Sequence, residues 1–99
     1  MAFWQLNVER LIENCGIEIG NIVISTMGRD KGKYFIVVGV EENYVYLVDG
    51  AIRKIDRPKK KKIKHIELTN FHDENIATRV INKYKITNHD VKKALKEIL

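Results

Sequence analysis

The stretch that most constrains the fold of this chain covers residues 20–40, where two apolar runs flank a polar hexamer. The runs, at 22–24 and 34–40, are rich in β-branched side chains, and the hexamer at 28–33 contains two glycines. Such runs are typical of strands, and a short polar connection with glycine is typical of a hairpin. Because glycine adopts positive φ without steric cost, we expect the two glycines to shape the turn. The tip of this hairpin carries three cations, Arg29, Lys31 and Lys33.

Three further strands are predicted between this hairpin and residue 68. Apolar and β-branched residues indicate strands at residues 44–48, 52–55 and 62–68. In the ranges 44–48 and 62–68, these residues also alternate between two faces, as they do in a strand. The Asp49-Gly50 pair is a strong turn signal between the first two of them. Five short strands in one segment of this length are typical of a small barrel. We expect its interior to hold Val45, Leu47, Ile66 and Leu68.

The two ends of the chain follow a helical period instead. Apolar side chains within residues 1–16 recur at helical spacing, which predicts an amphipathic N-terminal helix. Residues 73–84 carry a similar stripe, formed by Ile76, Val80, Ile81 and Tyr84. Another helix is predicted from Thr87 onward, because Thr87 and Asp90 have the spacing of a capping box. We therefore predict a mainly β domain with flanking helices, in which residues 72–99 form a helical hairpin joined by about three residues and packed on the barrel.

Charge is distributed unevenly along the 99 residues. The chain has 18 basic and 13 acidic residues, a formal net charge of +5, and the middle segment at 53–64 holds most of the excess. A local excess of this kind predicts an anion-binding face. The single cysteine, Cys15, excludes an intrachain disulfide and fits a reducing cytoplasm. Since no apolar run approaches the ~20 residues of a membrane span, we expect a cytoplasmic protein without a membrane segment.

Patterns of catalytic or metal-binding residues are not found in the sequence. His65, His72 and His89 are scattered and lack the spacing of a histidine metal site. The glycines and lysine at 28–33 lack both the spacing of a phosphate-binding P-loop and the Ser or Thr that follows it. We therefore expect no enzymatic activity, no metal and no cofactor.

The hairpin stretch at residues 20–40 contains Gly20, Val23, Gly28, Gly32 and Val37. Through these residues, the stretch resembles a KOW motif. The resemblance continues in Val48-Asp49-Gly50, Arg53-Lys54, Pro58 to Lys62, and His65. These residues are similar to the archaeal and eukaryotic large-subunit ribosomal proteins called fourteen-e. They are more similar still to small bacterial KOW-domain RNA-binding proteins related to that group. The match covers residues 20–68, about half of the chain, and implies an SH3-like barrel that binds ribosomal RNA.

The predicted RNA contacts are the cations of the middle segment and of the hairpin tip. Lysine and arginine bind phosphates with salt-sensitive affinity and without reading bases. Tyrosines on the outer face of the 44–48 strand are predicted to stack on unpaired bases, and His65 enters through the resemblance. The predicted RNA-binding residues are Arg29, Lys31, Lys33, Tyr44, Tyr46, Arg53, Lys54, Arg57, Lys59, Lys60, Lys61, Lys62, Lys64 and His65.

Several alternatives stay open for the same residues. The lysine run also fits a solvated surface, the outer tyrosines also fit packing under a helix, and Asp30 also fits a turn residue that accepts from backbone amides. KOW domains of NusG-type transcription factors also bind proteins, so a protein-interaction module is the alternative function. A Tudor-like barrel would form an aromatic cage for a cationic side chain from Tyr34, Tyr44 and Tyr46. We expect the N-terminal helix to pack on the edge of the barrel, and the alternative is a docking element for a protein partner or a second copy.

Overall fold

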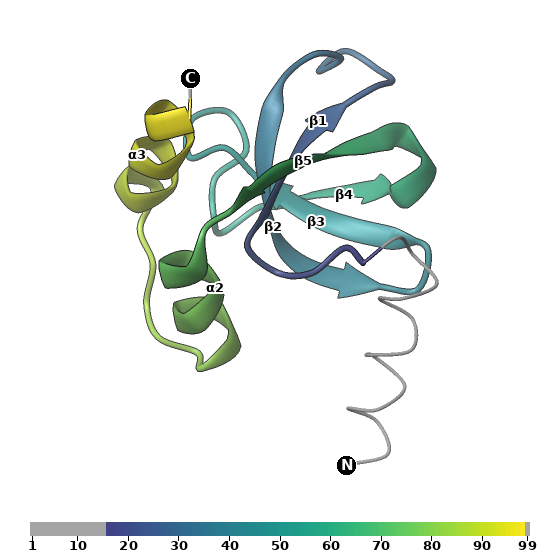
Figure 1. Cartoon of the computed structure of the whole chain (residues 1–99). Coiled ribbons are helices and arrows are strands. Elements are labelled where there is room, and N and C mark those ends of the chain that lie inside the picture. Colours follow the sequence, from purple (N-terminus) through teal and green to yellow (C-terminus); the bar gives the residue numbers. More distant parts are fainter. Residues whose placement is uncertain (1–15, 99) are drawn as a thin grey trace.

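The computed structural model describes residues 16–98, which form an antiparallel sheet with two helices on one side of it (Figure 1). The helix predicted over residues 1–16 lies outside the described residues apart from Gly16, and Cys15 lies outside them too. The strands are β1 (Asn21–Ser25), β2 (Tyr34–Glu41), β3 (Tyr44–Val48), β4 (Lys59–Lys62) and β5 (Ile66–His72). The helical elements are the 3₁₀ helix η1 (Ile63–His65) and the α-helices α2 (Glu74–Ile81) and α3 (Asn88–Ile98). Within this described part, the chain forms no helix with the length and apolarity needed to cross a membrane.

The sheet has the strand order β4-β3-β2-β1-β5, and all neighbouring strands pair antiparallel. The first four strands are neighbours in the order in which the chain makes them, and β5 returns to pair with β1. The two strands predicted within residues 20–40 and the strand predicted at 44–48 are confirmed. The expectation of a mainly β fold with five strands is therefore confirmed as well.

Alternation along the strands gives the sheet two buried faces. One face contains Ile22, Ile36 and Val48, which form a cluster with apolar side chains of α2 and α3. The opposite face forms a second cluster of Ile17, Val23, Phe35, Val37, Val45 and Leu47. The four side chains predicted to point inside all belong to this second cluster, with Val45 and Leu47 fully buried and Ile66 and Leu68 partly buried against it.

One of the predicted strands is wrong, and another is interrupted by a 3₁₀ helix. Residues 52–55 belong to a loop that spans residues 49–58, where the amide of Ile55 donates to the side-chain oxygen of Asn88 (2.9 Å) and not to a strand ladder. The fourth strand is β4, a run of four lysines whose low strand propensity is overridden by pairing with β3. The strand predicted at residues 62–68 is interrupted by η1, so β5 begins at Ile66 and extends to His72.

The starts of both α-helices are fixed by side-chain caps. The carboxylate of Asp73 accepts a hydrogen bond from the amide of Ile76 (2.9 Å) at the start of α2. At the start of α3, the amide of Thr87 donates to Asp90 Oδ2 (2.9 Å) and the amide of Asp90 donates to Thr87 Oγ1 (3.1 Å). The predicted capping box is therefore confirmed.

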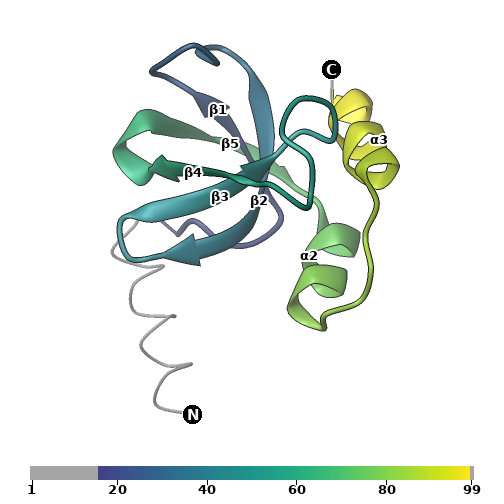
Figure 2. The same ribbon diagram turned by 180° about the vertical axis from the view of Figure 1, so that it is seen from behind.

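The predicted helical hairpin differs from the structure in its connection. Because α2 ends at Ile81, the connection to α3 covers residues 82–87 and is longer than the predicted three residues. Tyr84, expected on the packed stripe, lies in this connection and is 68% exposed, and Ile81, the last residue of α2, is 63% exposed. The two helices lie one above the other along one side of the sheet (Figures 1 and 2), and both contribute to the cluster around Ile22.

Candidate nucleic-acid interface

The connection between β1 and β2, residues 26–33, forms the β1–β2 loop. Its base is closed by hydrogen bonds from the Ser25 amide to the Lys33 carbonyl (3.0 Å) and from the Gly32 amide to the Ser25 carbonyl (2.8 Å). Gly28 and Gly32 have positive φ values of 91° and 87°, a backbone region that other residues rarely adopt. Positive φ at these two glycines is what the sequence predicted. This backbone presents the three cations of the loop to solvent, Arg29, Lys31 and Lys33.

The register between β3 and β4 decides which lysines of β4 are exposed. Val45, which points into the second apolar cluster, pairs with Lys61, so the Lys61 side chain lies on the interior face. Lys60 and Lys62 pair with the outward tyrosines of β3 and are exposed. Only 7% of Lys61 is exposed. The prediction that Lys61 is a surface cation in contact with RNA is therefore wrong.

The ammonium group of Lys61 is bound by the β1–β2 loop. Lys61 Nζ donates to Asp30 Oδ1 (2.5 Å) and to the carbonyl of Met27 (2.6 Å). The hydroxyl of Ser25, also buried, donates to the same Asp30 oxygen (2.7 Å). Asp30 thus fixes the loop mainly through side-chain partners, with its own backbone amide as a smaller contributor, whereas the sequence suggested bonds to backbone amides.

The ionised state of Asp30 is favoured by these partners. Partial burial alone would raise the pKa of Asp30, but hydrogen bonds from Lys61 and Ser25 and the charge of Lys61 outweigh it and lower the pKa from its ordinary value of 3.8. Within the described residues, the second carboxylate oxygen of Asp30 is buried without a hydrogen-bond partner. A buried pair that leaves one oxygen unsatisfied adds little net stability, and its main effect is to fix position.

A second contact fixes the β1–β2 loop to the segment that follows β4. The amide of Thr26 donates to the carbonyl of His65 in η1 (2.9 Å). The loop, β4 and η1 therefore lie together at the end of the sheet away from α3 (Figures 1 and 2). We call the exposed cations of this region the loop-end surface, which consists of Arg29, Lys31, Lys33, Lys60, Lys62 and Lys64. Two predicted contacts, Lys59 and His65, are half-buried here.

The connection between β3 and β4, residues 49–58, forms the β3–β4 loop and carries the other predicted cations. Asp49 Oδ1 accepts from the amides of Ala51 (3.0 Å) and Arg53 (2.8 Å), which folds the start of the loop into a compact turn. The amide of Ile55 bonds Asn88 at the start of α3. The structure therefore carries Arg53, Lys54 and Arg57 toward α3, and the cationic stripe predicted at 53–64 is split between two ends of the sheet.

The outward tyrosines of β3 are engaged by neighbouring side chains. The ammonium of Lys60 lies 4.5 Å from the ring centroid of Tyr44, a cation–π contact, and it also lies 3.5 Å from Glu41 Oε1. The hydroxyl of Tyr46 donates to the same Glu41 oxygen (2.9 Å). Tyr34 is at the opposite end of β2 from Glu41 and packs on the helix side. The fold therefore does not bring the three tyrosines of the Tudor-like alternative together as a cage.

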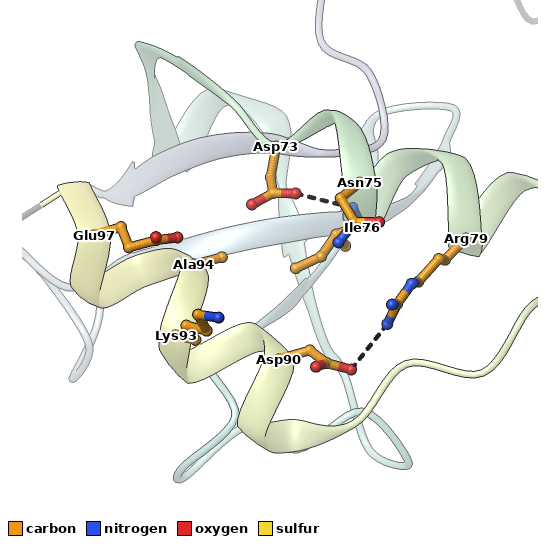
Figure 3. A pocket seen from close by; sticks show the side chains of 8 residues that line it. All are labelled: Asp73, Asn75, Ile76, Arg79, Asp90, Lys93, Ala94 and Glu97. Atoms are coloured by element: carbon orange, nitrogen blue, oxygen red, sulfur yellow. Dashed lines mark hydrogen bonds and ion pairs between the residues drawn. The ribbon is translucent and has the colours of Figure 1, made fainter.

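A polar groove of about 250 Å³ lies between the facing sides of α2 and α3 (Figure 3). Arg79 on α2 donates to Asp90 on α3 at 3.2 Å across it. Hydrogen bonds from the amide and hydroxyl of Thr87, helped by the charge of Arg79, lower the pKa of Asp90 from 3.8. Asp73, also in the groove, caps α2. Asp73 and Asp90 stabilise the helix starts, and we assign no ligand to the groove.

Among residues 16–98, no group of three or more His, Cys, Asp or Glu side chains could hold a metal ion.

Comparison of the sequence with models of known protein families finds no match. The KOW-like motif is thus a resemblance carried by individual residues. Two of those residues, Gly28 and Gly32, have the left-handed backbone that explains why glycine occurs there. Others lie in the β3–β4 loop, where Asp49 and Gly50 form the turn that the pair predicted. Sequence reasoning missed that Lys61 is the partner of Asp30. Lys61 is one of four consecutive lysines, and only the strand register distinguishes it from the other three.

Proposed function

We propose that this chain is a cytoplasmic KOW-type protein that binds structured RNA, with ribosomal RNA as its target, through the phosphate contacts of the loop-end surface. The observation that carries the proposal is the buried pair of Lys61 and Asp30. It fastens the β1–β2 loop to β4, so the cations of the loop are held beside the strand that carries the exposed Lys60 and Lys62. A cationic surface that is already ordered loses less conformational entropy when it binds a polyanion.

The proposal includes an SH3-like barrel as the fold class. Its support is that β5 pairs with β1, while the two outer strands of the sheet, β4 and β5, are joined by the short helix η1. The apolar side chains of Ile63, Ile66 and Leu68 in this region pack on the second apolar cluster and cover it from outside β1–β3. This arrangement is what a small curved sheet closing around one interior requires.

Contacts to phosphates, and not base stacking on β3, are the proposed basis of binding. Lys60 already covers the ring of Tyr44, so a base would have to displace it. The loop-end surface contains only lysines and one arginine, which position a nucleic-acid backbone but read no sequence when they bind phosphates. We therefore propose recognition of RNA shape, as is usual for double-stranded RNA.

The first test is the salt dependence of RNA binding. Fluorescence anisotropy of an end-labelled, structured ribosomal RNA fragment would be measured with the purified chain over a series of salt concentrations. If about four to six phosphates are neutralised, the slope of log affinity against log salt should be roughly −3 to −5. Absent binding at low salt, or affinity that does not respond to salt, contradicts the proposal.

Variants of the loop-end surface sharpen this test. Lys60→Gln with Lys62→Gln should make the salt slope shallower by about one for each phosphate that is no longer neutralised. The matched control is Lys83→Gln with Lys85→Gln, which removes the same charge from exposed positions of the α2–α3 connection. Equal effects of the two double variants would mean that only net charge matters and that the surface is assigned wrongly.

A further inference from the structure

The cations that the β3–β4 loop carries away from the loop-end surface form a surface of their own. We propose that the helix-end surface, defined as Arg53, Lys54, Arg57, Lys92 and Lys96, binds the phosphate backbone of a second RNA segment. One chain would then hold two RNA segments, one at each end of its sheet. This inference rests on the proposed function, because it takes RNA as the partner of the loop-end surface.

Close packing joins the β3–β4 loop to α3. Gly50, with φ of 79°, lies so close to the helix that an added Cβ would overlap the carbonyl oxygen of Asn88 and lie 2.9 Å from Lys92 Cγ. The amides of Asp49 and Gly50 both donate to the carbonyl of Arg53 (2.9 and 3.1 Å). Arg53 and Lys92 are therefore held on adjacent parts of one rigid unit.

The two flanks of α3 differ in charge. Val91, Ala94 and Leu95 are buried against the sheet, which leaves one flank on each side of the helix. The flank toward α2 is mixed: Asp90, Lys93 and Glu97 line the polar groove with Arg79 (Figure 3). The flank toward the β3–β4 loop has Lys92, which meets Gly50, and Lys96 one turn further along. Only this second flank extends a cationic surface.

Acidic side chains neutralise the helix-end surface only in part. Asp49 is occupied by the amides of its own turn, and Asp56 is the other acid of the β3–β4 loop. Among residues 16–98, none of the five cations of this surface forms an ion pair. All but Arg53 are exposed, and Arg53 is half-buried. Unpaired cations held on a rigid unit raise the local concentration of a polyanion.

The positions of the two surfaces imply that they act on different RNA segments. Figures 1 and 2 both show the β1–β2 loop and η1 on one side of the sheet, with the β3–β4 loop and α3 toward the other side. Along the chain, Pro58 and the half-buried Lys59 separate Arg57 of the helix-end surface from Lys60 of the loop-end surface. The chain therefore suits a clamp between two phosphate backbones better than a single continuous track.

A capture assay tests this inference with the full chain. One short RNA hairpin is fixed to a surface, the chain is bound to it, and a second, labelled copy of the hairpin is added. The parent chain should retain the labelled hairpin. Arg53→Gln with Lys92→Gln and Lys96→Gln should still bind the fixed hairpin through the loop-end surface but should lose most of the capture. On a long structured RNA, the salt slope of this triple variant should become shallower by about one for each phosphate that is no longer neutralised.

The matched control is Lys83→Gln with Lys85→Gln and Lys93→Gln, which removes three charges outside both surfaces. It should capture the second hairpin as the parent does. Capture that survives in the helix-end variant, as dimerisation through another surface would produce, overturns the inference. So does a parent chain that binds one hairpin but captures no second one, a result that leaves the proposed function intact. Failure of the parent to bind any RNA defeats the proposed function itself.

Discussion

The β1–β2 loop and the β3–β4 loop are built from similar residues but are held in different ways. Each contains a glycine with positive φ, an aspartate that organises the turn and two or more cations. In the β3–β4 loop, Asp49 accepts from amides two and four residues ahead, so the turn is local. In the β1–β2 loop, Asp30 binds an ammonium group from a residue 31 positions away.

This difference determines which kind of substitution should disrupt each loop. A turn made of backbone hydrogen bonds and close packing is broken by added volume, because its partners cannot move. A turn made of a buried ion pair is broken by loss of one charge, because the other charge is then left unpaired. We therefore expect the β3–β4 loop to be sensitive to size and the β1–β2 loop to be sensitive to charge.

The largest expected effect is that of Gly50→Ala. The new Cβ would overlap the backbone of Asn88 and lie 3.2 Å from the amide nitrogen of Lys92, at a position where φ is already positive. Backbone strain and overpacking together should lower the free energy of unfolding by about 3–5 kcal/mol. Urea unfolding followed by circular dichroism measures the change.

Gly32→Ala is the control from the other loop. It has the same kind of backbone, with φ of 87°, but no atom lies within 4 Å of the added Cβ. Only the conformational strain remains, so the loss should be about 1–2 kcal/mol. Equal losses for the two variants would show that packing of Gly50 on α3 contributes nothing to the loop.

A smaller effect is expected from Lys61→Met, which keeps the length of the side chain and removes its charge. Asp30 would remain largely buried without its cation, and the free energy of unfolding should fall by about 3 kcal/mol, the lower end for removing one partner of a buried pair. Lys62→Met makes the same chemical change one residue away on the exposed face and should cost below about 1 kcal/mol. Thermal melts of the two variants compare them directly, and similar melting temperatures would contradict the inward role of Lys61.

Much of the fold could be predicted because its signals are local. Alternation placed Val45 and Leu47 inside, and the spacing of Thr87 and Asp90 placed the start of α3. Glycine chemistry also identified both loops. These features depend on residues within a few positions of each other, so the sequence alone reports them.

The parts that could not be predicted depend on contacts between distant segments. No local pattern separates Lys61 from Lys60 or Lys62, because only its register opposite Val45 turns it inward. The path of residues 49–58 follows α3, which the chain makes about 30 residues later, so a strand at 52–55 was a reasonable but wrong expectation. The division of the predicted cationic stripe into two surfaces follows from that same path.

The smallest expected effect compares the two organising aspartates. Asp49→Asn keeps a side-chain oxygen that can still accept from the amides of Ala51 and Arg53, so its loss should be below about 1 kcal/mol. Asp30→Asn also keeps an oxygen but removes the charge opposite Lys61, and it should be the more destabilising of the two. Denaturant unfolding at neutral pH ranks them.

Acid adds a second readout for Asp30. The folded state lowers the pKa of Asp30 below 3.8, so the unfolded chain takes up the proton more readily. The stability that comes from the Asp30 charge is therefore fully present above pH 3.8 and is lost as the pH falls through the lower, folded-state pKa. The parent chain should lose stability steeply in that acidic range, and Asp30→Asn, which has no proton to gain there, should lose less.

Asp90→Asn serves as a second reference, because the pKa of Asp90 is also lowered from 3.8 but by partners at the start of α3. If Asp30→Asn followed the acid profile of the parent, the charge of Asp30 would not be what holds the β1–β2 loop, and the contrast between a charge-held loop and a size-held loop would fail.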